Sequence, residues 1–296
     1  MTIRFGLSPI AWVNDDMPEL GAGTSLETIL RESQEIGFEG VELGGIFPRE
    51  PNALKAALAP YQLDLVGGWY SGSLLVQDAD AEIAALQPHL QLLKAMGSTV
   101  FVFAETSNAV HGNRAVPLEG TPRLKSGEWA QFGERMSNVS DYIAGQGLRF
   151  AYHHHLGTVV ENQADMDAFI KATSPSVGFT LDTGHAALGG VKSVDVIERH
   201  PDRIAHVHCK DVRGPIHAEA RRTGRSFLDG VLAGMFTVPG DGGIDFRAVM
   251  RALKAIEYSG WIIIEAEQDP AIANPRIYGE LGLATLKREA ASAGLI

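Results

Sequence analysis

The sequence predicts a single-domain (β/α)8 barrel that covers residues 1–296, and three observations support this fold class. Short apolar runs alternate with longer amphipathic stretches eight times, the chain has 296 residues, and no interdomain linker interrupts it. Strands separated by helices pair in parallel through right-handed crossovers. Eight such units at this length favour a closed barrel over an open sheet, and no Gly-x-Gly-x-x-Gly follows the first strand.

Each strand is predicted from a short apolar run between turn signals, and each helix from an amphipathic stretch. The strands cover residues 3–9, 40–43, 63–69, 99–104, 149–153, 177–181, 204–208 and 261–265. The helices that follow them cover residues 25–36, 52–58, 79–96, 126–146, 163–173, 193–200, 245–256 and 275–291. Ser25 can cap the first helix, while Gly97 and Gly147 are expected to end the third and fourth. The Arg- and Gly-rich segment 212–243 is predicted as a long loop insertion after strand seven.

Composition excludes several classes of partner. The formal net charge is -11, so the overall field does not attract phosphate backbones and no nucleic-acid partner is expected. No apolar run approaches the ~18 residues that a membrane span needs, and the first residues do not read as a signal peptide. One cysteine, Cys209, excludes an intrachain disulfide. We therefore expect a cytoplasmic protein with a small-molecule substrate, and by analogy with other barrels a homo-oligomer.

Polar residues gather at the C-terminal ends of the predicted strands, where barrel enzymes build their active sites. The N-terminal ends carry fewer of them. The residues concerned are Asn14, Asp15, Asp16, Glu42, Glu105, His153, His154, His155, Asp182, His185, His206, His208, Lys210, Asp211, Glu265 and Glu267. A random scatter of polar residues would not select one end, so the pattern predicts a functional site there.

Strand alternation sorts these candidates. It places His206, His208 and Lys210 on one face of their strand, and Glu265 and Glu267 on one face of theirs. A barrel interior lined by His, Asp and Glu is costly unless those groups bind something. A mixed imidazole and carboxylate set suits Zn, Mn, Co or Fe. The sequence therefore predicts a divalent metal site, on the agreement of four adjacent strands.

Each residue also has a structural interpretation when taken alone. A single His at a strand end is more often hydrogen-bonded than a metal ligand. His154 has the opposite parity from its two neighbours and is interpreted as structural, and Cys209 has the parity of a buried, inert thiol. His185 can orient a neighbouring ligand, and Trp12 can belong to the core instead of stacking on a sugar.

Several fragments resemble a known family. LDTGHA, HVHCKD, GDGGIDF and GWIIIE are similar to the xylose isomerase-like barrels, which include sugar isomerases, epimerases and apurinic endonucleases. SPIAWVNDD, AYHHHLGT, HVHCKDVR, FTVPGDG and EAEQDP resemble, in this order, the myo-inosose-2 dehydratases of that superfamily. The resemblance runs from about residue 5 to about residue 270.

The resemblance implies a set of metal ligands. The superfamily uses Glu, Asp, His and Glu from strands five to eight, which implies Asp182, His208 and Glu265 here. His153 stands where the first Glu is expected, so it can bind a metal but cannot act as a carboxylate base there. Whether Glu265 or Glu267 is the direct ligand stays open. The implied metal is Mn²⁺ or Co²⁺, and the resemblance also implies a benefit from glutathione.

The resemblance further implies dehydration of 2-keto-myo-inositol, a cyclitol ketone, to a trihydroxycyclohexane-1,2-dione in inositol catabolism. A dehydratase removes a proton α to the ketone and expels a β-hydroxyl, which suggests His155 or Glu267 as base and Lys210 as stabiliser or acid. Substrate contacts are expected from Trp12, Asn14, Glu42, Glu105, His185 and Arg213.

Three alternatives stay open at this point. An inosose or ketose isomerase or epimerase on the same barrel would need two active carboxylates, which Glu267 and Glu105 could supply. A repair enzyme for abasic DNA is disfavoured by the net charge of -11. A barrel that binds a sugar or metal without catalysis would not need an inward row of His, Asp, Lys and Glu.

Overall fold

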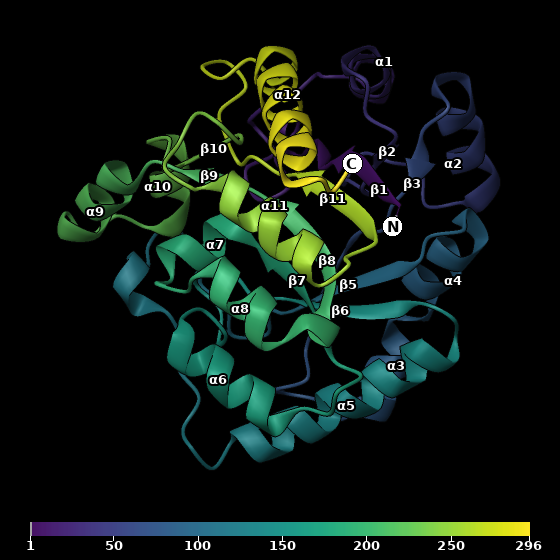
Figure 1. Ribbon diagram of the computed structural model, residues 1–296. Coiled ribbons are helices and arrows are strands. Elements are labelled where there is room, and N and C mark those ends of the chain that lie inside the picture. Colours follow the sequence, from purple (N-terminus) through teal and green to yellow (C-terminus); the bar gives the residue numbers. More distant parts are fainter. Residues whose placement is uncertain (1) are drawn as a thin grey trace.

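Parallel strands form a closed barrel in the computed structural model, which describes residues 2–296 (Figure 1). The hydrogen-bonded order is β3-β2-β1-β11-β8-β7-β6-β5-β4. Because β3 and β4 are consecutive pieces of the third barrel strand, this order closes a ring of eight positions and confirms the predicted fold. The barrel strands are β1 (Ile3–Leu7), β2 (Gly40–Val41), β3 (Asp64–Leu65), β4 (Trp69–Gly72), β5 (Val100–Glu105), β6 (Arg149–His153), β7 (Gly178–Asp182), β8 (Ile204–Cys209) and β11 (Gly260–Ile264).

The third barrel strand is interrupted, whereas the sequence predicts one strand over 63–69. Its first piece, β3, pairs with β2, and its second piece, β4, pairs with β5. Backbone pairing continues between the pieces, because Val66 N–H donates to Val41 and Leu43 N–H donates to Gly67, each at 2.9 Å. The interruption therefore leaves the barrel closed.

Helices surround the barrel on its outside (Figure 1). They are α1 (Leu26–Ile36), α2 (Pro51–Leu58), α3 (Ala79–Ala85), α4 (Gln87–Met96), α5 (Trp129–Gly145), α6 (Gln163–Ala172), α7 (Thr183–Leu188), α8 (Ser193–Arg199), α11 (Phe246–Ala255) and α12 (Pro275–Ala293). Ser25 caps α1 as predicted, accepting from Thr28 N–H. Gly97 ends α4 at φ 76°, a left-handed conformation that glycine adopts without strain.

Two helical predictions need correction. The stretch predicted as one helix over 79–96 is divided into α3 and α4, with Pro88 in the first turn of α4. Proline has no N–H to donate and is tolerated in the first turn of a helix, so a new helix starts there. The short helix α7, which directly follows β7, was not predicted; the carboxylate of Asp182 caps it.

The segment 212–243, predicted as a long loop, contains regular structure. After β9 (Asp211–Val212) it holds α9 (Gly214–Arg222), α10 (Phe227–Leu232) and β10 (Phe236–Thr237), which pairs antiparallel with β9. Phe227, Val231 and Phe236 are buried in a separate apolar cluster with Leu156. The segment protrudes from the side of the barrel (Figure 1), and this cluster holds it beside the C-terminal ends of the strands.

The barrel interior changes from apolar to polar along its axis. Val100, Val102, Ala151 and Ile263 are buried together in one small inner cluster, while Phe101 belongs to the larger core that includes helix residues. Because side chains alternate along a strand, the inward position after Ala151 is residue 153, and the one after Ile263 is residue 265. The apolar layer therefore supports a polar layer at the C-terminal ends.

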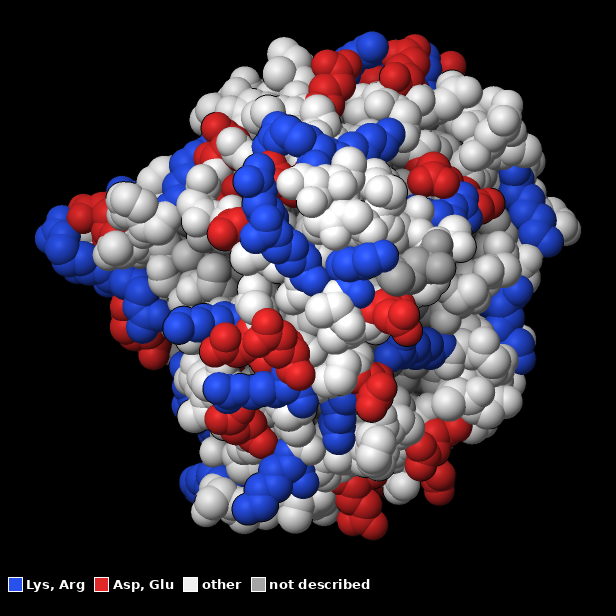
Figure 2. Space-filling view, viewed as in Figure 1, with Lys and Arg blue, Asp and Glu red and all other residues white. Residues whose placement is uncertain are grey.

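The outer helical surface carries charges of both signs. Basic and acidic side chains are interspersed over the face shown in Figure 2. Arg247 and Arg288 each pair with Glu289, at 2.9 Å and 2.8 Å, and the first of these pairs links α11 to α12. No helix within residues 2–296 is both long enough and apolar enough to cross a membrane.

Candidate active site

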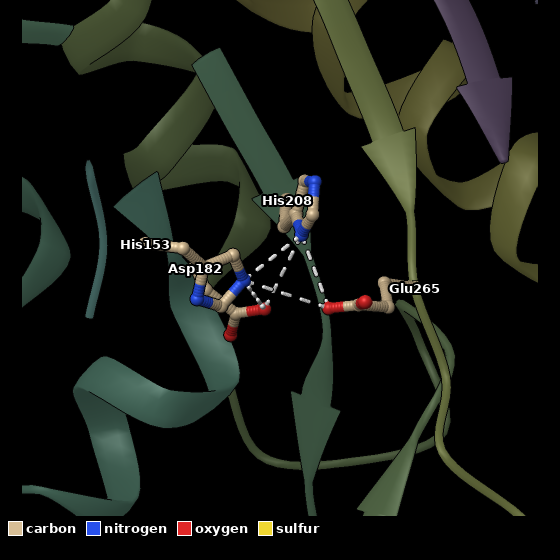
Figure 3. Close-up of side chains that lie close together, drawn as sticks. All are labelled: His153, Asp182, His208 and Glu265. Atoms are coloured by element: carbon tan, nitrogen blue, oxygen red, sulfur yellow. Dashed lines mark hydrogen bonds and ion pairs between the residues drawn. The ribbon is translucent and has the colours of Figure 1, made fainter. Parts of the chain in front are cut away.

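Four side chains from four adjacent strands converge at the C-terminal end of the barrel (Figure 3). His153 and Asp182 end β6 and β7, His208 lies on β8, and Glu265 directly follows β11. Each offers one ligand atom, and the four atoms lie within 4.8 Å of one another. His208 Nδ1 is 3.0 Å from Glu265 Oε2 and 3.3 Å from His153 Nε2. The structure thus brings together the four residues that the sequence analysis selected as ligands.

The donor atoms of this cluster fit one divalent ion. Ligand bonds of about 2.1 Å separate neighbouring ligand atoms by about 3.0–3.4 Å. His208 Nδ1 has this spacing from Glu265 Oε2 and His153 Nε2, whereas His153 Nε2 lies 3.9 Å from both Asp182 Oδ2 and Glu265 Oε2, so the side chains would move slightly closer together around an ion. Asp182 Oδ1 accepts from Gly184 N–H and His185 N–H at 2.8 Å, so the start of α7 fixes this carboxylate. Its other oxygen, Oδ2, is buried without a hydrogen-bond partner. Lys210 Nζ lies 3.7 Å from this oxygen, beyond hydrogen-bond distance. A buried carboxylate oxygen without a hydrogen bond is costly, and a cation in the cluster would satisfy it.

Neighbouring acceptors set the tautomers of the two imidazoles. His153 Nδ1 donates to the carbonyl of His154 at 2.9 Å, which leaves the lone pair of Nε2 facing the cluster. His208 Nε2 donates to Glu42 Oε1 at 3.0 Å, which leaves Nδ1 facing the cluster. Such outer partners commonly orient histidines that bind metals.

The electrostatics of His208 show that its surroundings attract positive charge. Burial disfavours the charged imidazole, but Glu42 and Glu265 on either side outweigh burial and raise the pKa of His208 well above its ordinary value. A proton and a metal ion compete for the same Nδ1 atom. The cluster is therefore a candidate divalent metal site, built from two imidazoles and two carboxylates.

A second cluster joins Glu42, His206 and His208. Glu42 Oε1 accepts from His206 Nε2 at 2.9 Å and from His208 Nε2 at 3.0 Å. Burial raises the pKa of Glu42, but the two imidazoles outweigh it and lower this pKa to about 2. These hydrogen bonds satisfy the group without an ion. The structure therefore places Glu42, expected as a substrate contact, where it orients His208, although Glu42 also borders the cavity described below.

A third cluster, His155, His185 and Glu267, already surrounds a cation. Lys210 Nζ lies 2.5 Å from Glu267 Oε1 and 3.0 Å from His185 Nε2. Burial lowers the pKa of Lys210, but Glu265, Glu267 and Asp182 outweigh it and raise this pKa, so the ammonium stays charged. Lys210 fills the place that a second metal would take, and Glu267 belongs to this cluster while Glu265 belongs to the first.

A cavity of about 460 Å³ opens over the metal cluster. This volume lies within the range of about 300–1,000 Å³ that is usual for ligand pockets. The predicted strand-end residues that line it are Asp15, Asp16, Glu42, His155, His208, Glu265 and Glu267. Lys210 and His185 are fully buried and lie behind this lining, so His185 does not reach the position expected for a substrate contact.

Two groups that can transfer protons line the cavity. His155 Nδ1 donates to the carbonyl of Leu156 at 2.6 Å, which leaves a lone pair on Nε2. Burial first, then the nearby His111, lowers the pKa of His155 well below its ordinary value, so the imidazole is neutral. Burial raises the pKa of Glu267 to about 7, against the opposing effect of Lys210. Base-like and acid-like groups therefore stand beside the same cavity.

Two expected substrate contacts near the N-terminus lie outside the cavity lining. Trp12 is buried in the main core, and its Nε1–H donates to Glu32 Oε2 at 2.6 Å. Asn14 Oδ1 accepts from Asp16 N–H at 2.9 Å and from Met17 N–H at 2.8 Å. Asn14 holds the segment after β1 by accepting two of its backbone N–H groups, and Trp12 anchors this segment to α1 through Glu32.

The side chains of Glu105 and Arg213 also lie outside the cavity lining, where they form hydrogen bonds with backbone groups of nearby segments. Glu105 is fully buried; its carboxylate accepts from Leu74 N–H at 2.6 Å and from Ser107 N–H at 2.9 Å. Arg213 donates to the carbonyl of Gly234 at 2.8 Å and to Thr237 Oγ1 at 3.1 Å. The first residue joins the loops after β4 and β5, and the second stabilises the segment with α9 and α10.

Sequence reasoning did not select several residues that line the cavity. These are Arg49, Trp69, Ser71, Thr106 and His111, which line it together with Asp15 and Asp16 from the predicted strand-end group. All of them follow the first four barrel strands or lie in β4, so position after a strand was the available signal. That signal is weak in loops, because no periodicity tells which side chain turns inward.

The fold and the site together define a (β/α)8 barrel enzyme with a candidate divalent metal centre at the C-terminal ends of its strands. Residues 30–287 match the family model described as a xylose isomerase-like TIM barrel, and the chain belongs to this family.

Relatives with known names extend over nearly the whole chain. Rhizopine catabolism protein MocC of Rhizobium meliloti is 44% identical over 294 residues, which cover 99% of this chain and 90% of that protein. An inosose dehydratase of Bacillus licheniformis is 41% identical over 280 residues, covering 93% and 92%. The solved structure of L-ribulose 3-epimerase has a TM-score of 0.71 at 16% identity and covers 100% of this chain and 96% of its own, which shows a shared fold.

Proposed function

We propose that the protein is a metal-dependent dehydratase that removes water from 2-keto-myo-inositol to give a trihydroxycyclohexane-1,2-dione in inositol catabolism. The observation that carries this proposal is the four-donor cluster at the floor of a cavity that also exposes His155 and Glu267. Relatives named inosose dehydratase, 36–41% identical to this chain, support the choice of substrate.

His153, Asp182, His208 and Glu265 would hold Mn²⁺ or Co²⁺ through the atoms that face one another in Figure 3. A bound divalent ion supplies Lewis-acid polarisation of the ketone oxygen, which stabilises the charge that develops when the α-proton leaves. Glutathione, which the family resemblance implies, enters no step of this mechanism.

His155 is the proposed base, because its Nε2 keeps a lone pair and the residue lines the cavity. It takes the proton from the carbon α to the ketone. The bond from the β-carbon to its hydroxyl then breaks, and the hydroxyl leaves as water with a proton from the Glu267 carboxyl group. The elimination leaves the enol of the 1,2-dione, which gains a proton at the β-carbon and loses the proton of its hydroxyl group to become the dione. Exchange with solvent returns His155 to its neutral form and reprotonates Glu267, so atoms and charge balance over a turnover.

Lys210 and Glu42 are proposed as positioning residues, because each acts through another side chain. Lys210 Nζ lies 2.5 Å from Glu267 Oε1 and 3.1 Å from Glu265 Oε2, so it holds the acid beside a metal ligand. Glu42 holds the Nε2–H of His208 and thereby directs Nδ1 to the metal.

The position of Glu105 argues against an isomerase or epimerase that uses two carboxylates. Such a mechanism needs an acid on each face of the substrate, and Glu105 would have to be the partner of Glu267. Glu105 is fully buried and is bonded to backbone N–H groups of Leu74 and Ser107. With His153 in place of the other family carboxylate, the carboxylates that line the cavity beyond the metal ligand Glu265 and the orienting Glu42 are Glu267, Asp15 and Asp16, and Asp15 accepts from Gly45 N–H at 3.0 Å.

A role in rhizopine catabolism is a second candidate. The relative with that name is 44% identical, above the 36–41% of the inosose dehydratases. The same active site would serve it. Incubation of the metal-loaded enzyme with a rhizopine, followed by product NMR, decides whether this compound is turned over faster than the inosose.

The direct test is turnover of 2-keto-myo-inositol by EDTA-stripped protein with and without added Mn²⁺ or Co²⁺. Diketone absorbance and product NMR report the loss of water. The proposal predicts dehydration that returns with metal. Exchange of the α-proton with solvent deuterium without loss of water would instead support an isomerase. The cytoplasmic location and the homo-oligomeric state stay predictions.

A further inference from the structure

The loop between β5 and α5 carries a histidine to the cavity that the proposed mechanism does not use. His111 lines the cavity together with His155, Glu265 and Glu267. The centroid of its ring is 4.7 Å from that of His155 and 6.4 Å from that of Trp69. An imidazole from a different element therefore stands next to the proposed base.

The Nδ1 atom of His111 is buried and has no hydrogen-bond partner among residues 2–296. Burial first, against an opposing effect of Asp16, lowers the pKa of His111, so the ring is neutral with one donor and one acceptor. A buried polar atom without a partner is costly. The ring itself borders the cavity, so a substrate hydroxyl group, which both donates and accepts, would pair with the ring nitrogen that is turned toward it.

Gly157, two residues after the proposed base His155, holds the loop that carries His111 in place. Val110 N–H donates to the carbonyl of Gly157 at 2.8 Å. Gly157 has φ +79°, and a Cβ there would lie 2.9 Å from the backbone nitrogen of His111. Because Gly157 lies two residues after His155, the turn that carries the base also fixes the position of His111.

We propose that His111 is a specificity-determining residue that hydrogen-bonds one hydroxyl group of the bound cyclitol, an inference that rests on the proposed function. His111 comes from the loop after β5 and is not one of the four donors, so it offers the ring a contact separate from the metal site. The residue thus selects a polyhydroxylated ring without taking part in proton transfer.

The first test replaces His111 by Ala in the metal-loaded enzyme. KM for 2-keto-myo-inositol should rise about 10- to 100-fold, kcat should change less, and metal content should stay constant. His200→Gln, a change at a half-buried histidine beyond the cavity lining, is the control. Monodeoxy analogues identify the contact: one of them should lose affinity in wild type and lose no more in His111→Ala. Equal KM values for wild type and variant would overturn the proposal.

A second variant pair tests the position of His111 without removing its ring. Gly157→Ala introduces the close contact with the His111 backbone, at φ +79°. Gly97→Ala imposes similar backbone strain, at φ +76°, where a Cβ meets no atom within 4 Å. We expect a raised KM for Gly157→Ala alone, among variants that bind metal normally. A similar KM for both variants would contradict the role of this turn in seating His111.

Binding measurements separate this inference from the proposed function. If wild type does not dehydrate the ketone, calorimetry with myo-inositol and the metal-loaded protein still reports recognition of the ring. Binding by wild type that weakens at least tenfold in His111→Ala would keep the inference while the reaction is rejected. Equal binding by both proteins, or binding by neither, would overturn the inference.

Discussion

The two halves of the barrel mouth carry similar polar residues but use them differently. At the ends of β6, β7, β8 and β11, the side chains of His153, Asp182, His208 and Glu265 point at one another, and Asp182 Oδ2 accepts no hydrogen bond from residues 2–296. In the half formed by β1 to β5, Asn14 and Glu105 accept backbone N–H groups of the loops. The comparison teaches that a polar residue at a strand end serves chemistry only where the backbone leaves its ligand atom free.

The two halves also differ in how charge is compensated. Asp182, Glu265 and Glu267 are buried around the ammonium of Lys210, which leaves an excess of negative charge for a divalent ion. Such burial is costly without a cation. In the other half, the buried carboxylate of Glu105 is compensated by hydrogen bonds from the backbone N–H groups of Leu74 and Ser107 instead of by a cation.

The largest effect is expected from a change at Asp182, a ligand in the half of the mouth that carries the metal cluster. Asp182→Asn keeps an oxygen to accept from Gly184 and His185 but weakens the charge at the metal. We expect loss of bound metal and a fall in kcat of about 10³-fold or more. Elemental analysis and turnover measure both quantities. A variant with full metal content and full activity would remove Asp182 from the site.

Glu42 links the two halves, because it follows β2 and bonds to His208. Glu42→Gln should weaken metal affinity by about 10- to 100-fold, since the outer acceptor of a ligand histidine is altered. The visible spectrum of the Co²⁺ form should shift as well. Glu32→Gln is the matched control, because it alters a carboxylate that accepts from Trp12 in the core. Unchanged affinity and spectrum in Glu42→Gln would reject the positioning role.

Glu105 tests the other half. The two carboxylate oxygens of Glu105 accept from Leu74 N–H and Ser107 N–H. In Glu105→Gln, the side-chain NH2 group replaces one of these oxygens, so it faces a backbone N–H and that hydrogen bond is lost. The free energy of unfolding should fall by about 2 kcal/mol, while metal affinity stays at the wild-type value. Urea denaturation and a metal titration on the same sample check both. A loss of metal affinity with unchanged stability would place Glu105 with the catalytic half.

Trp12 should give the smallest effect. Trp12→Phe removes the hydrogen bond to Glu32 and keeps an aromatic ring in the core. We expect the free energy of unfolding to fall by about 1 kcal/mol and KM to stay within about twofold of wild type. Thermal unfolding and steady-state kinetics are the measurements. A large rise in KM without loss of stability would show that Trp12 contacts the substrate, as the sequence analysis expected.

Local rules were sufficient to predict the barrel and a metal site at the C-terminal ends of its strands, while the family resemblance implied which four residues would be the ligands. Alternation along β8 places His206, His208 and Lys210 on the inner face, and all three are buried there. The ends of parallel strands meet at one face, which brings His153, Asp182 and Glu265 together. These inferences need no knowledge of contacts between distant segments.

Loop residues could not be sorted in the same way, because distant contacts decide where they point. Asn14 and Glu105 follow strands as the ligands do, but the N–H groups they accept become visible only in the folded chain. Conversely, His111 reaches the cavity because Val110 bonds to Gly157, more than forty residues away. The helices between residues 212 and 243 form on a separate apolar cluster that periodicity did not reveal.

The most direct test of this account is an anomalous diffraction map of crystals grown with Mn²⁺. We expect one strong peak at bonding distance from His153 Nε2, Asp182 Oδ2, His208 Nδ1 and Glu265 Oε2. Lys210 should still pair with Glu267. A peak among His155, His185 and Glu267, or no peak at the four donors while the crystallised enzyme is active, would contradict it.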